Sequence, residues 1–144
     1  MTKKPFAHGT TVTVGKSRGQ IEDLVTAHGA SMFVSGYEGD RANILFKMKD
    51  RRVRFQLQLV KSGGLFTELE AERENMRRWR CLFFLLKAKL SAVEDGLATF
   101  EEEFLAFTLV PGSNGETVAQ WIGPQLSYAY EKGVAMPPLL GSGR

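Results

Sequence analysis

The chain has 144 residues, of which 43% are hydrophobic and 24% are charged, and Cys81 is its single cysteine. This length and composition fit one globular domain and exclude a mainly disordered chain. One cysteine excludes an internal disulfide and a zinc site built from several cysteines, and it favours a reducing cytoplasm. No run approaches the roughly 18 apolar residues of a membrane span, and the first ten residues lack the apolar core of a secretion signal. We expect one domain over 1–136, a tail over 137–144 and no membrane contact.

The first elements are predicted from β-branched residues and capping residues. Residues 11–14 form a short β-branched run, which predicts a strand. Ser17 with Gln20 has the spacing of a capping box, which predicts a helix over about 18–28. The strand would therefore be followed at once by a helix.

Three further strands are predicted at 31–37, 42–48 and 52–59, with short polar turns between them. The last strand alternates apolar residues with polar ones, and the polar ones are Arg52, Arg54, Gln56 and Gln58. This alternation predicts an antiparallel meander with one buried face and one face in water.

The second half of the chain has a helical period. Thr67 with Glu70 makes a further capping box and Gly96 is a stop signal, so a helix of about thirty residues is predicted between them. Its apolar residues repeat every seven positions, with a second set in between: Leu69, Met76, Phe83, Leu90 and Leu97, then Trp79, Leu86 and Val93. Such a seam packs against another surface. We expect Trp79, Phe83, Leu86 and Leu90 to be core residues, and the all-apolar stretch 81–86 to be covered on several sides.

Two shorter helices follow this long one. The first begins after Thr99 and is expected to end near 109–111, and the second begins after Thr117 and ends at Gly133. Gly123-Pro124 must kink or interrupt the second. We therefore predict an α+β domain of order β-α-β-β-β, with an antiparallel sheet covered by the long helix and with C-terminal helices after it.

The motifs that carry chemistry are weak. Gly15-Lys16-Ser17 matches the last three residues of the phosphate-loop motif. That motif also requires a glycine at position 10, where this chain has Thr10. His8 and His28 lie far apart, without carboxylates or cysteines at ligand spacing, and Cys81 is predicted to be a buried, inert thiol. We expect no enzymatic activity, no metal and no cofactor.

Charge is the informative feature. Residues 1–66 carry 11 Lys or Arg against 5 Asp or Glu, and residues 67–144 carry 8 against 11. Basic side chains gather on the wet sides of two strands, at the turn between them and along one stripe of the long helix. We assign nucleic-acid contact to Lys47, Lys49, Arg51, Arg52, Arg54, Arg73, Arg77 and Arg80.

Tyr37 or Phe33 could supply a stacking surface beside these cations. The plain alternative is a solvated sheet face, with the helix arginines paired to Glu70, Glu72 and Glu74 on neighbouring turns. Both interpretations stay open at this point.

Several segments together resemble a family of small phage and mobile-element proteins. They are VGKS at 14–17, RRVRF at 51–55, RWR at 78–80, KAKL at 87–90, TFEEEFL at 99–105 and MPPLL at 136–140. The resemblance implies a viral or prophage origin, hence the cytoplasm of a host cell, and it carries no activity with it.

We therefore expect a non-enzymatic phage accessory protein that binds single-stranded DNA or RNA through its basic face, without sequence preference. The alternative is a phage-encoded module that binds or inhibits a host protein, such as a defence protein. The charged start of the long helix further suggests a homodimer in which a second copy covers Leu69, Met76 and Trp79.

Overall fold

The structure, a computed structural model, describes residues 3–137. Along the chain it contains α1 (Val14–Ala27), β1 (Met32–Glu38), β2 (Arg41–Met48), β3 (Arg51–Gln58), α2 (Glu68–Glu94), α3 (Phe100–Phe104), the 3₁₀ turn η1 (Leu105–Phe107) and α4 (Val118–Lys132). The α+β class, the three consecutive strands and the long helix are confirmed. Most of the expected tail, 138–144, lies outside the described residues.

The predicted strand at 11–14 is wrong, and the helix after it begins four residues earlier than expected. Thr13, not Ser17, is the N-cap, and its Oγ1 accepts a hydrogen bond from the Lys16 amide at 3.2 Å. Ser17 lies inside the first turns of α1 and is fully buried. A threonine with extended backbone can close a helix start as well as extend a strand, and here the cap prevails.

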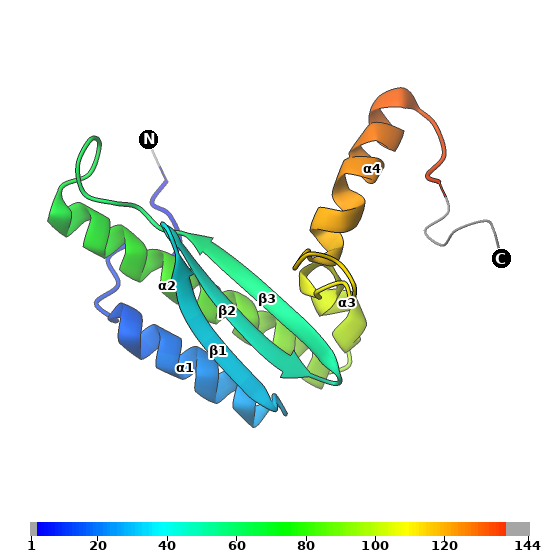
Figure 1. Ribbon diagram of the computed structural model, residues 1–144. Helices are drawn as coiled ribbons and strands as arrows, with labels where there is room; N and C mark the ends of the chain where they lie inside the picture. Colours follow the sequence, from blue (N-terminus) through cyan, green and yellow to red (C-terminus); the bar gives the residue numbers. More distant parts are fainter. Residues whose placement is uncertain (1–2, 138–144) are drawn as a thin grey trace.

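The three strands form an antiparallel meander in the order β1-β2-β3. Both α1 and α2 lie on one side of this sheet, side by side, and they leave its other side without a covering helix (Figure 1). Ile44, Phe46 and Met48 of β2 and Val53 and Phe55 of β3 are buried under the two helices. The period-two alternation thus gives the buried face and the open face that the sequence predicts.

Aromatic rings join the C-terminal segment to this core. Phe104 of α3 is fully buried and meets Phe46 and Phe55 edge to face, with ring centroids 6.1 and 6.3 Å apart. Phe107 of η1 stacks on Phe55 at 4.1 Å. Edge-to-face and offset-stacked pairs are the favourable geometries of aromatic rings. The rings therefore fix η1, and the chain after it, beside β3.

The seam of α2 follows the prediction only in part. Trp79, Leu86 and Leu90 are buried and Phe83 is partly buried, but Leu69 is 53% exposed and Leu97 is 82% exposed. A seven-residue repeat drifts by about 20° per heptad on a straight helix, so its first member leaves the buried side. Phe84 and Leu85 are also exposed, so the stretch 81–86 is not covered all round.

Polar contacts hold the charged N-terminal half of α2. Asn75 accepts a hydrogen bond from the Val60 amide at 2.9 Å and donates one to the Val60 carbonyl at 3.0 Å. Trp79 is only 1% exposed, beneath its own sheet, so it is not available to a second copy. Of the expected dimer seam, Leu69 remains exposed and Met76 is half-buried.

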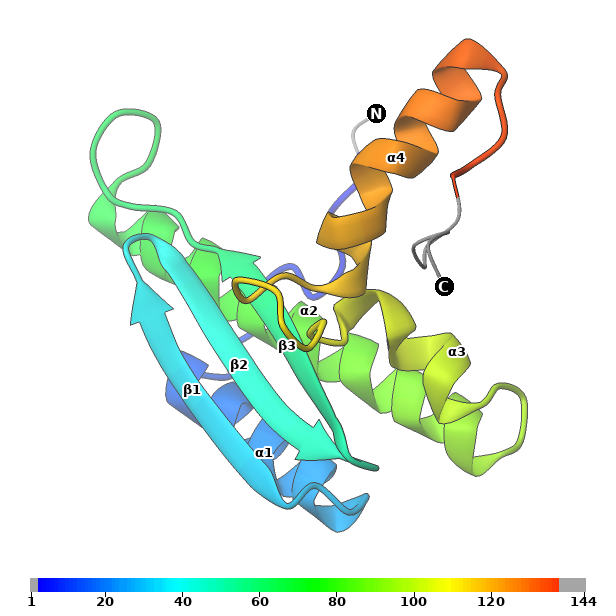
Figure 2. The same ribbon diagram turned by 45° about the vertical axis from the view of Figure 1, so that its right-hand side comes forward.

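The last helix, α4, runs without interruption through Pro124 and ends at Gly133 in a left-handed conformation. It projects away from the two-layer body (Figure 2). Leu126, Tyr128 and Tyr130 on it are exposed. Between η1 and α4 the chain folds back, with Leu109 donating to the Arg52 carbonyl at 2.8 Å and Val118 donating to the Thr108 carbonyl at 2.9 Å.

The core assignment is testable with one matched pair of substitutions. Leu86→Ala removes a fully buried side chain and should lower the free energy of unfolding by about 2–5 kcal/mol. Leu97→Ala makes the same chemical change at an exposed position and should alter it by less than about 0.5 kcal/mol. Urea unfolding measures both, and equal losses in the two variants would contradict this core.

Candidate nucleic-acid interface

The open face of the sheet is basic at one end only. Strand register places Lys47 of β2 directly beside Arg52 of β3, with Met32 of β1 on the other side of Lys47. The next row holds Val34, Leu45 and Arg54. Cations therefore gather on the β3 side of the open face, and apolar side chains lie toward β1.

A groove of about 710 Å³ lies at this basic end. Lys47, Arg51 and Arg52 line it from the sheet, together with Asp50 of the β2–β3 turn. The facing wall is the segment 108–115, with Val118 and Trp121 of α4. Its volume lies within the range of roughly 300–1,000 Å³ in which proteins hold ligands.

The charge in the groove is mixed, with an excess of cations. Arg52 is exposed. Arg51 forms an ion pair with Glu101 of α3, in which Nε and Oε1 are 3.0 Å apart. Lys49 and Asp50 form the tight turn between β2 and β3, both with positive φ, and Lys49 is exposed there. Lys47 and Arg52 are thus the two cations best placed to meet an anion in the groove.

Arg54 lies on the same face of the sheet, but its guanidinium binds other groups of the protein. Its Nη1 donates to the Gly115 carbonyl at 2.7 Å, and its Nη2 donates to Gln120 Oε1 at 2.8 Å. Gln120 Oε1 also accepts from the Thr117 amide at 2.9 Å, which closes the capping box of α4. The sequence assigned Arg54 to a phosphate, whereas the structure uses its guanidinium to join β3 to the start of α4.

The arginines of α2 lie elsewhere. Arg77 donates to the carbonyl of Phe6 in the N-terminal segment, and Arg80 contacts Gln20 of α1 and lies over the ring of Phe83 at 4.4 Å. Arg73 is exposed on the same stripe. Because α2 buries its opposite side under the sheet, this stripe faces α1 and the N-terminal segment. The eight predicted residues are therefore divided between two surfaces.

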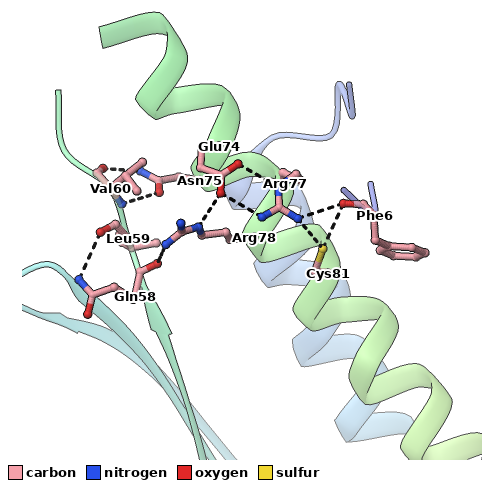
Figure 3. Close-up of polar contacts among 9 residues, drawn as sticks. All are labelled: Phe6, Gln58, Leu59, Val60, Glu74, Asn75, Arg77, Arg78 and Cys81. Carbon is pink, nitrogen blue, oxygen red and sulfur yellow. Dashed lines mark hydrogen bonds and ion pairs between the residues drawn. The ribbon is translucent and has the colours of Figure 1, made fainter. Parts of the chain in front are cut away.

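Glu74 is the centre of a polar cluster on α2 (Figure 3). Its two carboxylate oxygens accept from Nε of Arg77 and Nε of Arg78, each at 2.8 Å. Arg78 also donates to the carbonyl of Gln58 at the end of β3. Arg77 contacts the carbonyl of Phe6 and lies 3.5 Å from the sulfur of Cys81, which is half-buried rather than buried as expected. The pair between Arg77 and Glu74 is one that the alternative with paired helix charges predicts. The further bonds of Arg77 and Arg78 join α2 to the N-terminal segment and to the sheet.

The hydrogen bond from Arg77 is the largest cause that lowers the pKa of Glu74 from 4.5 to about 2, with Arg78 adding to it against the opposing effect of burial. Glu70 carries a milder effect of another origin: its hydrogen bonds with Thr67 in the capping box lower its pKa, and nearby Arg73 contributes. Both carboxylates are therefore ionised at neutral pH and serve the architecture of α2.

The stacking residues expected from the sequence lie on the wrong face. Phe33 pairs with buried Phe46 and packs against the core. Tyr37 is exposed, but it pairs with buried Ala42 and so belongs to the helix-covered side. The aromatic residue that does line the basic groove is Trp121, which is 37% exposed. In the sequence, Trp121 is a large aromatic residue in the first turns of the last predicted helix, and no packing partner is predicted for it. A ligand-binding role for Trp121 is not among the predictions from the sequence.

The polar cluster generates a pH prediction. A folded-state pKa below the ordinary one adds stability above pH 4.5, and this contribution is lost as the pH falls toward 2. Glu74→Gln should lower the free energy of unfolding by about 1–2 kcal/mol at pH 7, after allowance for partial solvent screening.

The difference between Glu74→Gln and the parent should shrink between pH 4.5 and 2, as measured by urea unfolding at several pH values. Glu72→Gln, an exposed neighbour, is the control and should follow the parent throughout. A Glu74→Gln deficit that stays constant down to pH 2.5 would contradict the role of the carboxylate charge.

Within residues 3–137, no helix is long and apolar enough to cross a membrane, and no group of three His, Cys, Asp or Glu side chains is placed to hold a metal ion. No protein-family model, curated protein or solved structure matches the chain.

Proposed function

We propose that this protein is a non-enzymatic, phage-type accessory protein that binds nucleic acid without sequence preference, in the groove at the basic end of the sheet. The observation that carries the proposal is the adjacent pair Lys47 and Arg52 on the floor of a cavity of about 710 Å³. Two neighbouring cations in a concave site favour a polyanion over a single carboxylate.

The shape of the site supports a polymer rather than a small enclosed ligand. The groove is bounded on one side by the sheet and on the other by the segment 108–115 and the start of α4. Lys49 lies exposed at the adjacent turn between the end of β2 and the start of β3, so positive charge continues beyond the groove at this edge of the sheet. Contacts to phosphates of this kind give affinity and orientation but carry no sequence information.

The arginine stripe of α2 contributes little to this proposal. Arg77 is occupied by Glu74 and by the Phe6 carbonyl, and Arg80 by Gln20 and Phe83. Side chains engaged in this way have fewer free donors for a phosphate. We therefore narrow the nucleic-acid site to Lys47, Lys49, Arg51 and Arg52.

The salt dependence of binding tests the proposal. Each phosphate contact on a single strand adds about 0.7 to the slope of log affinity against log salt. Lys47→Gln with Arg52→Gln should weaken binding of an oligonucleotide at ~50 mM salt and reduce that slope by about 1.4.

The matched control is Arg73→Gln with Lys87→Gln, which removes the same charge from exposed positions on α2. This control should keep the parent's slope. Absence of binding by the parent at ~50 mM salt would contradict the proposed function, and an equal loss in both double variants would move the site away from the groove.

A second candidate function is favoured by one observation. Leu126, Tyr128, Tyr130 and Val134 are exposed on or just after α4, which projects from the body (Figure 2). Exposed apolar residues grouped on one element are typical of protein interfaces. The candidate is a module that binds a host or phage protein through this helix.

This second candidate predicts that a specific protein is captured and stays bound after nuclease treatment and at moderate salt. The reason is that an apolar interface is less sensitive to salt than phosphate contacts are. Leu126→Ser with Tyr130→Ser should abolish that capture while oligonucleotide binding persists. Capture that disappears with nuclease would instead support the first function.

A further inference from the structure

The groove has an aromatic wall as well as a basic floor, and the proposal that follows rests on the function proposed above. Trp121 lines the groove from α4, facing the side that Lys47 and Arg52 line from the sheet. A tryptophan that is 37% exposed still offers ring surface to a ligand. Phosphate-binding cations with one accessible aromatic ring form the combination used to hold single-stranded nucleic acid.

We propose that the groove holds a single-stranded segment with one base stacked on Trp121 and the flanking phosphates on Lys47 and Arg52. A duplex keeps its bases stacked on one another, so it cannot present a base face to Trp121 without unpairing. The site therefore favours single strands over duplexes, of either DNA or RNA, since every base has a face that can stack.

Arg54 acts in this site as a positioning residue. Its guanidinium donates hydrogen bonds to the Gly115 carbonyl and to Gln120 Oε1. Gly115 lies just before the start of α4, and Gln120 lies in its first turn, directly before Trp121. The two bonds join β3, which carries Arg52, to the helix that carries Trp121. The guanidinium therefore adds a side-chain link between the basic floor and the aromatic wall, beside the backbone bonds from Leu109 to the Arg52 carbonyl and from Val118 to the Thr108 carbonyl.

The contacts of α4 with the rest of the protein make this constraint important. Among the secondary-structure elements, η1 is the principal neighbour of α4, and the helix otherwise projects into solvent (Figure 2). Without the Arg54 bonds, the capping box of α4 would still form, because Thr117 and Gln120 bond each other. The helix would persist and its backbone link through Thr108 and Leu109 would remain, but Gln120 in its first turn would lose its side-chain bond to the open face of the sheet.

Two oligonucleotides of equal length separate stacking from charge. One is a 15-mer of thymidylate, and the other is an abasic 15-mer with the same phosphates and no bases. The parent should bind the thymidylate about 10- to 100-fold more tightly, which is the worth of one stacked base. Tryptophan fluorescence should be quenched by the thymidylate and not by the abasic strand.

Trp121→Ala should abolish both the preference and the quenching, because the remaining Trp79 is buried. It should leave the abasic affinity and its salt slope unchanged. Trp121→Phe should retain most of the preference, since phenylalanine also stacks. Thermal melting checks that each variant is folded.

Gln120→Ala tests the positioning role without changing any charge, and Thr117→Val, which disrupts the same capping box but keeps the Gln120 acceptor of Arg54, is its control and should keep the parent's ratio. Gln120→Ala removes one acceptor of Arg54, so the ratio of thymidylate to abasic affinity should fall while the abasic affinity stays constant. Gln120→Glu, which keeps an acceptor oxygen at that place, should restore the ratio.

The possible outcomes test nucleic-acid binding and stacking on Trp121 separately. No binding of either strand by the parent would overturn the proposed function. Equal binding of both strands, or a preference that survives Trp121→Ala, would overturn stacking on Trp121 and leave the phosphate site standing. Tighter binding of a 15-base-pair duplex than of the single strand would also overturn it.

Discussion

The packing of Phe104 and Phe107 against Phe46 and Phe55 is the interaction on which the rest of the structure depends. It closes the end of the core between sheet and α2, and it fixes the chain after α2 beside β3. Large aromatic side chains contribute strongly to core stability because each buries much apolar area in a defined geometry. The segment 108–115 and α4 follow directly after Phe107, so the packing of these rings positions them beside β3. The groove between this segment and the sheet depends on that packing.

The open face of the sheet follows from the same burial. Three strands with period-two alternation have one apolar face, and α1 and α2 together cover it (Figure 1). The polar side chains of β2 and β3 are then left in water on the other side. Lys47 and Arg52 are basic neighbours there because the tight turn at Lys49 and Asp50 folds β3 back along β2 and sets the register that pairs them.

Charged residues serve two different purposes in this protein. Arg77 and Arg78 bind Glu74 and the backbone carbonyls of distant segments (Figure 3). Arg54 binds Gly115 and Gln120 at the start of α4. These groups maintain the arrangement of elements. Of the four cations in the proposed site, Arg51 pairs with Glu101, whereas Lys47, Lys49 and Arg52 take part in none of the ion pairs among the described residues, and the four gather at one end of the sheet.

The sequence by itself determined the three strands from β1 onward, the inward and outward sides of β2 and β3, and the helix starts at Thr67, Thr99 and Thr117. These features are local: they depend on alternation and on caps that bond residues three positions away. The sequence did not determine where the helix after Thr99 ends, because α3 stops at Phe104 rather than near 109–111, and α4 continues through Pro124. At the start of α1 the local patterns were misleading: the β-branched run 11–14 predicted a strand and Ser17 a cap, whereas Thr13 caps the helix.

Only the tertiary structure decided how the basic residues are used. The spacing of Arg77 and Arg80 put them on one helix stripe, but whether that stripe shares a surface with Arg52 depends on which side of α2 packs under the sheet. The role of Arg54 depends on Gly115 and Gln120, which are more than sixty residues away along the chain. Trp121 lines the same groove as Lys47 and Arg52 for the same reason, because aromatic packing at η1 brings a distant segment beside the open face, and no local pattern encodes that approach.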